Sequence, residues 1–184
     1  MFKQTKHVTL LRDCKAITIP NGVPITLAKG SDVIITQALG NSYTIYVSGQ
    51  LCRVLGEDGD ALGQAVIALA RPVEESADVQ GVNLEQIFDQ IRTCYDPEIP
   101  VNIVDLGLIY DVNCDELIDG RNFVRITMTL TAAGCGMGTI IAEEVKNKCL
   151  SVPHVDDVEV ALVFDPPWSY DMISDVAKLE LGLL

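Results

Sequence analysis

The sequence is short of basic residues: it has 13 lysines and arginines against 26 aspartates and glutamates, a formal net charge of −13 at pH 7. A surface with that charge repels phosphate backbones, which argues against nucleic acid as a partner. The chain also lacks an apolar run long enough to span a bilayer, and its first residues lack the apolar core of a signal peptide. We therefore expect a cytoplasmic protein without membrane association.

The usual metal-binding patterns are missing as well. No two of the six cysteines are spaced as CxxC, which excludes zinc-finger and thioredoxin arrangements, and the chain has only two histidines. Because the cytoplasm keeps thiols reduced, we do not interpret the six cysteines as three disulfides. Thiol chemistry in this chain must therefore depend on single cysteines.

Residues 1–72 predict a small all-β domain. Five short β-branched or apolar runs are separated by turn residues, the last turn being GEDGD; the runs are KAITIP, VPITLA, DVIITQAL, YTIYVS and QLCRVL. Such spacing is typical of a small barrel or sandwich. Nothing in these residues resembles a catalytic constellation, so we expect an interaction or dimerisation module. The polar segment 73–82 fits a linker.

Residues 83–184 predict a second domain with the element order α-β-β-α-β-α. Asn83 and Gln86 resemble a capping box, and a helix with apolar spacing follows and should end at Pro97. The later elements are the strands LGLIYDVNC and FVRITMTLT joined by a hairpin, the helix TIIAEEVKNKCL, the strand VDDVEVALVF and the helix SYDMISDVAKLELG. The chain is therefore predicted to be α+β, with helices packed on a small mixed sheet in its second domain.

The stretch TAAGCGMGTII sets Cys135 between Gly134 and Gly136, at the predicted start of a helix. A thiol there faces unpaired backbone N–H groups and the positive end of the helix dipole, which favour the thiolate form. The glycines, with Gly138 beyond them, let the backbone approach another molecule closely. We interpret Cys135 as a reactive or metal-ligating thiolate in a loop that begins at Thr131. The alternatives are a small core cysteine and a phosphate-binding glycine loop.

An acidic turn precedes the first strand of the second domain. Asp96 and Glu98 flank Pro97, which stiffens the turn. If the next two strands pair as an antiparallel hairpin, this turn and the Cys135 loop lie at the same edge of the sheet. Glu98 or Asp96 would then ligate a metal together with Cys135, or hydrogen-bond to its thiol. A solvated turn that only ends the helix is an equally good interpretation.

Together these motifs resemble a known family. DPEIPVNIVDLGLIYDV followed by MTLTAAGCGMG resembles the iron–sulfur cluster assembly family, which shares DPE…DLGLIY and T-x-T-x-x-x-C motifs and includes the PaaD-like proteins. RDCKAITIPNGVPITLAKG and the GCGMG loop are similar to its two-part, SufT-type members. The resemblance implies an accessory factor in iron–sulfur protein maturation, with Cys135 as the functional thiol beside Asp96, Pro97 and Glu98. The partners it implies are iron–sulfur scaffold or carrier proteins and recipient apoproteins.

The number of thiolate ligands that the chain supplies limits how it could handle an iron–sulfur cluster. An iron–sulfur cluster usually has four thiolate ligands, and one well-placed cysteine per chain does not supply them. We expect a homodimer that shares a cluster or, in preference, a transient cluster handled during transfer. The sequence thus predicts non-enzymatic delivery of clusters or iron through Cys135. Two alternatives are a thiol-dependent enzyme with Cys135 as nucleophile, which needs a nearby base, and a metal-free scaffold.

Overall fold

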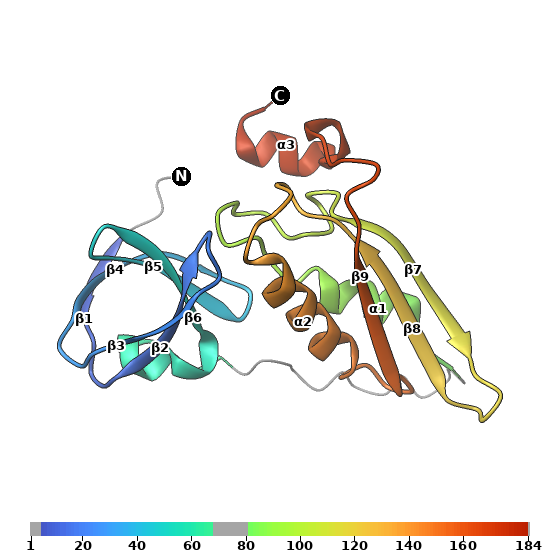
Figure 1. Ribbon diagram of the computed structural model, residues 1–184, viewed down its shortest axis with the longest axis horizontal. Helices are drawn as coiled ribbons and strands as arrows, with labels where there is room; N and C mark the ends of the chain where they lie inside the picture. Colours follow the sequence, from blue (N-terminus) through green and yellow to red (C-terminus); the bar gives the residue numbers. More distant parts are fainter. Residues whose placement is uncertain (1–4, 68–80, 184) are drawn as a thin grey trace. The chain divides into compact units, whose positions relative to one another are not determined.

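The computed structural model describes residues 5–67 and 81–183. The chain forms two compact units, one mainly in its N-terminal and one mainly in its C-terminal part, and each has its own sheet (Figure 1). The predicted linker, residues 73–82, lies outside the described residues except for Gly81 and Val82, so the domain boundaries stay predictions. No helix within the described ranges is long and apolar enough to cross a membrane.

The first unit is a six-stranded antiparallel sheet followed by a 3-10 helix. Its elements are β1 (Lys6–Thr9), β2 (Cys14–Ile19), β3 (Pro24–Leu27), β4 (Asp32–Leu39), β5 (Ser42–Val47), β6 (Gln50–Leu55) and η1 (Gly56–Leu62). The strands lie in the order β1-β4-β5-β6-β2-β3. Side chains such as Cys14, Ile45, Val54 and Leu62 are almost wholly buried and form one apolar core. The predicted all-β character of this part is confirmed.

Two elements of the first unit differ from the prediction. The sequence does not predict β1, because KHVT has a single apolar side chain and its place depends on backbone pairing with β4. GEDGD, predicted to be a turn, lies within η1. The Arg12 guanidinium donates to Asp58 (2.8 Å) and to Asp60 (2.5 Å), and it holds the pKa of the Asp60 carboxyl below its usual range. A side chain distant in sequence therefore orders this acidic segment.

The second unit is a three-stranded mixed sheet with helices. Its elements are α1 (Leu84–Ile91), β7 (Ile109–Glu116), β8 (Asn122–Met128), α2 (Gly138–Cys149), β9 (Asp157–Leu162), the 3-10 helix η2 (Tyr170–Met172) and α3 (Asp175–Leu181). β7 and β8 pair antiparallel, and β8 and β9 pair parallel. α1 and α2 cover one face of the sheet, whereas α3 lies beyond one end of it (Figure 1). The predicted element order and the mixed sheet are confirmed.

Alternation along β8 shows which face of this sheet is the core. Val124, Ile126 and Met128 are fully buried, whereas Arg125 between them is exposed. A period of two is expected for a strand with one face packed against helices and the other toward solvent. The sequence pattern therefore determines which face of the sheet receives α1 and α2.

α1 begins as predicted but ends earlier. The Asn83 side chain accepts hydrogen bonds from two backbone N–H groups of the first turn, which confirms it as the N-cap. The helix ends at Ile91 and not at Pro97. Thr93 donates its backbone N–H and its hydroxyl to the same carbonyl, that of Gln90, at 3.0 and 2.7 Å. These bonds tighten the last turn and end the helix before the proline exerts any effect.

β7, β8 and the last helix also have boundaries that the sequence misplaces. β7 begins at Ile109, since Gly107 has a left-handed φ of 72° that interrupts extended backbone. β8 ends at Met128, three residues short of the predicted end. The last helix begins at Asp175 and not at residue 169, because Ser174 is its N-cap and accepts from a backbone N–H at 3.2 Å.

Candidate functional site

The Cys135 loop, residues 129–137, connects the end of β8 to the start of α2. The Cys135 side chain is half-buried and free of any disulfide, and residues 132–134 and 136 around it are exposed. The sequence places Cys135 at the helix start, but α2 begins three residues later, at Gly138. Met137, in the turn just before the helix, is fully buried.

Gly134 in this loop and Gly138 at the start of α2 are glycines for different structural reasons. Gly134 has a φ of 83°, a conformation that other residues adopt only with strain, and open space around its Cβ position. At Gly138, a Cβ would lie 2.5 Å from Leu130 Cδ1. The missing side chain therefore lets α2 start directly against the end of β8. Thr131, at the other end of the predicted motif, is half-buried.

The acidic turn is closed at its base by a short backbone pairing. Tyr95 and Asn102 form an isolated antiparallel bridge on either side of the turn. Asp96 and Pro97 are buried, whereas Glu98 is exposed. Of the two carboxylates that the sequence proposes as ligands, Glu98 is therefore the one open to an incoming molecule.

Asn102 also orders the DLGL turn that follows, a role that pattern reasoning missed. Its side-chain oxygen accepts from the backbone N–H groups of Val104 (3.0 Å) and Asp105 (2.9 Å), and its amide donates to the Asp105 carboxylate (2.5 Å). Asparagine commonly nucleates a turn in this way. The asparagine in VNIVDLGL was the signal in the sequence that could have predicted this turn.

The DLGL turn and the Cys135 loop begin at the same end of the sheet. Ile109 pairs with Met128 at the end of the hairpin, and the Thr129 N–H donates to the Leu108 carbonyl at 2.8 Å. Antiparallel pairing places the start of β7 beside the end of β8 in this way. A direct contact between Cys135 and the carboxylates of the acidic turn stays a prediction.

Thr129 is a second residue near this site that the sequence reasoning missed. Its hydroxyl is fully buried and has no hydrogen-bond partner within the described part of the chain. A buried hydroxyl in that state costs about 1–3 kcal/mol, so a group that bonds to it would be favoured. Thr129 is the first threonine of the T-x-T-x-x-x-C motif that ends at Cys135.

The other five cysteines, all within the described ranges, lie in less accessible surroundings. Burial raises the pKa of Cys149 to about 12 and that of Cys14 to about 11. Cys52 and Cys94 are buried too, so the prediction that Cys94 and Cys149 are core residues is confirmed. Cys114 on β7 is half-buried, and desolvation together with Asp115 raises the pKa of its thiol. These surroundings disfavour the thiolate that reacts or binds metal.

We expect iodoacetamide at pH 7.5 to alkylate Cys135 before any other cysteine of the folded protein. Cys114 should react more slowly because its pKa is raised, and the four buried cysteines should react only after unfolding. Peptide mass spectrometry over a time course measures each site. Labelling of Cys114 at the same rate as Cys135, or labelling of Cys149 in the native state, would contradict this order.

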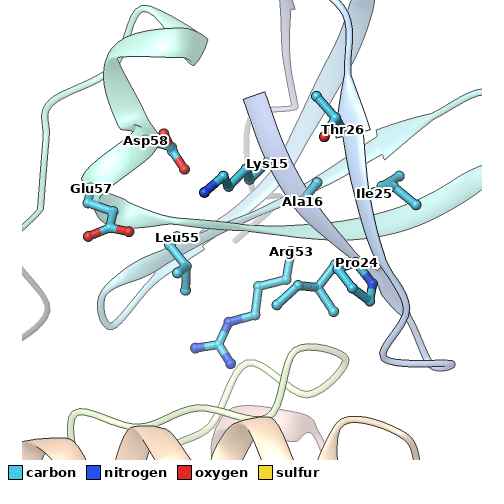
Figure 2. Close-up of a pocket in the computed structure, with 10 residues that line it drawn as sticks. Lys15, Ala16, Pro24, Ile25, Thr26, Arg53, Leu55, Glu57 and Asp58 are labelled. Carbon is cyan, nitrogen blue, oxygen red and sulfur yellow. The ribbon is translucent and has the colours of Figure 1, made fainter. Parts of the chain in front are cut away.

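A separate groove of about 420 Å³ lies on the first unit (Figure 2). Its walls come from β2, β3, β6 and η1, and its charged side chains are Lys15, Arg53, Glu57 and Asp58 around apolar residues. Asp58 is also held by Arg12 at 2.8 Å. The lining contains no cysteine, histidine or serine.

Metal ligands are sparse in the residues that the structure describes. No group of three or more His, Cys, Asp or Glu side chains there could hold a metal ion. Ligation by Cys135 and Glu98 therefore stays a prediction, and it would require further donors from another molecule.

Comparison with known proteins identifies the family. Residues 84–162 match the model of the family described as iron–sulfur cluster assembly protein. An Fe-S protein maturation auxiliary factor of Porphyromonas gingivalis is 49% identical over 54% of this chain and 91% of its own length. The auxiliary factor YitW of Bacillus subtilis is 46% identical (54% of this chain, 93% of its own), and SufT of Staphylococcus aureus is 43% identical (48% and 96%).

The chain therefore belongs to the iron–sulfur cluster assembly protein family, and the predicted resemblance to SufT-type proteins is confirmed. The matched residues contain both the acidic turn and the Cys135 loop. The site that the sequence singles out thus lies in the part of the chain that these relatives share.

Proposed function

We propose that this chain is an accessory factor of iron–sulfur protein maturation that passes a cluster, or iron, to recipient proteins through Cys135. Its relatives are named Fe-S protein maturation auxiliary factors. The observation that carries the proposal is the setting of Cys135, a half-buried thiol whose neighbours at 132–134 and 136 are exposed, whereas four of the other cysteines are in the core. We infer that its partners are the iron–sulfur scaffold or carrier proteins and the recipient apoproteins.

A single loop thiolate suits transfer better than storage. A cluster usually has four thiolate ligands, and the Cys135 loop supplies one. The remaining ligands would come from the protein that delivers the cluster and then from the recipient. When a recipient thiol binds iron it loses its proton, and Cys135 takes up a proton as its own bond to iron breaks. No electron is transferred in this exchange, and the cluster is cargo.

The test is a pair of cysteine variants in cells whose recipient enzymes depend on this chain. We expect Cys135→Ser to leave the circular dichroism spectrum and Tm unchanged and to lower the activity of an iron–sulfur dehydratase to the level of cells lacking the chain. Cys114→Ser is the matched control, because it removes the other half-buried thiol, and it should support normal activity. Normal dehydratase activity with Cys135→Ser would overturn the proposal and leave a metal-free scaffold role.

Anaerobic reconstitution with iron and sulfide measures the transfer step itself. We expect the wild-type chain, and not Cys135→Ser, to accelerate transfer from a loaded scaffold to an apo-ferredoxin, read by absorbance and metal content. A cluster shared in a homodimer would instead give a stable, coloured dimer in sedimentation. Both outcomes require Cys135, but only the first leaves the chain colourless after transfer.

A thiol-dependent enzyme receives no support from the geometry of the loop. His154 follows the C-terminal end of α2, whereas Cys135 precedes its N-terminal end. The 12 residues of α2 span about 18 Å, and a base must lie within about 3 Å of the thiol that it activates. We therefore propose a non-enzymatic role.

A further inference from the structure

α3 carries an apolar stripe that the rest of its unit does not cover. Val176 and Leu179 are each 69% exposed, and Leu183 just after the helix is 52% exposed. The left-handed Gly182 reverses the chain, and the Leu183 N–H returns to the Lys178 carbonyl at 2.8 Å. This Schellman turn brings the backbone at Leu183 back to the last helical turn.

Carboxylates flank the stripe on both sides. At 100° per residue, Val176 and Leu179 lie about 60° apart around the helix, and Asp175 and Glu180 lie about 40° outside them. Asp175 and Glu180 are both exposed. Lys178, the single cation of α3, donates its ammonium to the Asp171 carbonyl at 3.3 Å and lies 3.9 Å from the Asp175 carboxylate, so it offsets part of that charge. With Glu180 on the other side, the rim of the stripe still has a net negative charge.

The helix is held firmly although its outer face is open. The Ser174 N–H donates to the Asp105 carbonyl at 2.9 Å, and the Ser174 hydroxyl caps the helix through the Ala177 N–H at 3.2 Å. Ala177, on the opposite side from the stripe, is buried, as is Ile173 before it. A rigid, pre-positioned apolar face lowers the entropy cost of binding.

We propose that this face of α3 docks a basic amphipathic segment of a partner protein, with two or three apolar side chains flanked by lysine or arginine. Leucine-sized side chains on the partner would cover Val176 and Leu179, and cations would pair with Asp175 and Glu180. A second copy of this chain is a poor occupant, because it would set carboxylate against carboxylate. A membrane is a poor occupant as well, because anionic lipids repel the acidic rim.

A partner bound to α3 would lie at the end of the sheet where the Cys135 loop begins. Ser174 binds the DLGL turn through Asp105, and Leu108 at the end of that turn binds Thr129 at the start of the Cys135 loop. α3 and the Cys135 loop are thus attached to the same end of the sheet, and Figure 1 shows α3 beyond that end. The docking inference stands on the surface of α3 and does not depend on the transfer of clusters through Cys135.

The test uses a synthetic helical peptide of about 18 residues with leucine on one face and lysine on the other, added to the full chain and followed by fluorescence anisotropy. We expect the affinity of the chain for the peptide to fall as the salt concentration rises. We also expect the double variant Val176→Ser/Leu179→Ser to bind the peptide at least about tenfold more weakly than the wild type. This variant keeps every charge, so attraction to the net negative chain alone would survive it. The matched control, Val23→Ser, changes an exposed apolar residue of the first unit and should leave the affinity unchanged.

Cross-linking in cells then examines the natural occupant. A photoreactive residue at position 179 is expected to capture a peptide with apolar residues flanked by lysine or arginine, identified by mass spectrometry. Equal peptide affinity for the wild type and the serine double variant would overturn the proposal. A captured peptide of this same chain, a concentration-dependent dimer abolished by the serine variant, or flotation with lipid vesicles would overturn it too.

Discussion

Replacing Gly107 with alanine is expected to lower the free energy of unfolding of the second unit by about 2–4 kcal/mol. The residue has a φ of 72°, which strains any side chain. A Cβ there would also lie 2.3 Å from the Met172 carbonyl oxygen and 2.8 Å from its carbonyl carbon. Because backbone atoms have no rotamers to adjust, the segment around Met172 must move. Urea denaturation followed by circular dichroism measures the loss.

The matched control is Gly120→Ala in the β7–β8 hairpin. Gly120 has a similar φ of 80° but nothing within 4 Å of its Cβ position. We expect this variant to lose only about 1 kcal/mol, the cost of the backbone conformation alone. Trp168, the one tryptophan of the chain, donates its indole N–H to the Leu106 carbonyl at 2.8 Å. Its fluorescence should change in Gly107→Ala and not in the control. Equal losses of stability in both variants would contradict the packing argument.

Replacing Lys148 with alanine is expected to cost about 3–5 kcal/mol of unfolding free energy. The Lys148 side chain is 2% exposed, and its ammonium contacts the Glu144 carboxylate at 2.9 Å and the Thr93 carbonyl at 2.8 Å. Removing the lysine leaves the largely buried Glu144 carboxylate without this cation. It also removes the hydrogen-bond donor to the Thr93 carbonyl, which lies just after α1. The large loss arises from taking the lysine away from these two groups more than from the ion pair itself. Thermal and urea unfolding measure it.

Two further variants separate this cause from a general effect of helix substitutions. Arg92→Ala breaks the exposed pair with Asp89 (2.9 Å) and should cost at most about 1 kcal/mol. The double variant Lys148→Met/Glu144→Leu removes both charges and keeps most of the volume, so it should be clearly more stable than Lys148→Ala. If the double variant and Lys148→Ala lost the same stability, the buried charge left on Glu144 would not be the cause.

The features that the sequence predicts well are local. The strands β2 to β6 follow β-branched runs between turn residues, and Asn83 caps α1 through its own first turn. The alternation along β8 shows the buried face without any knowledge of the helices that cover it. Cys135 stands out because its glycine neighbours and the threonines before it form a contiguous motif. Each of these signals is carried by residues within a few positions of one another, where backbone geometry links sequence to structure directly.

The sequence by itself determined the class of fold, the order of the elements and the loop that carries the proposed functional thiol. Tertiary structure alone decided that Arg12 orders η1, that Gly107 must lack a side chain beside Met172, and that Lys148 is buried, although lysine is almost always exposed. It also left the stripe on α3 open. The physical reason is that these properties depend on contacts between residues far apart in the chain, and periodicity along the sequence carries no record of such contacts.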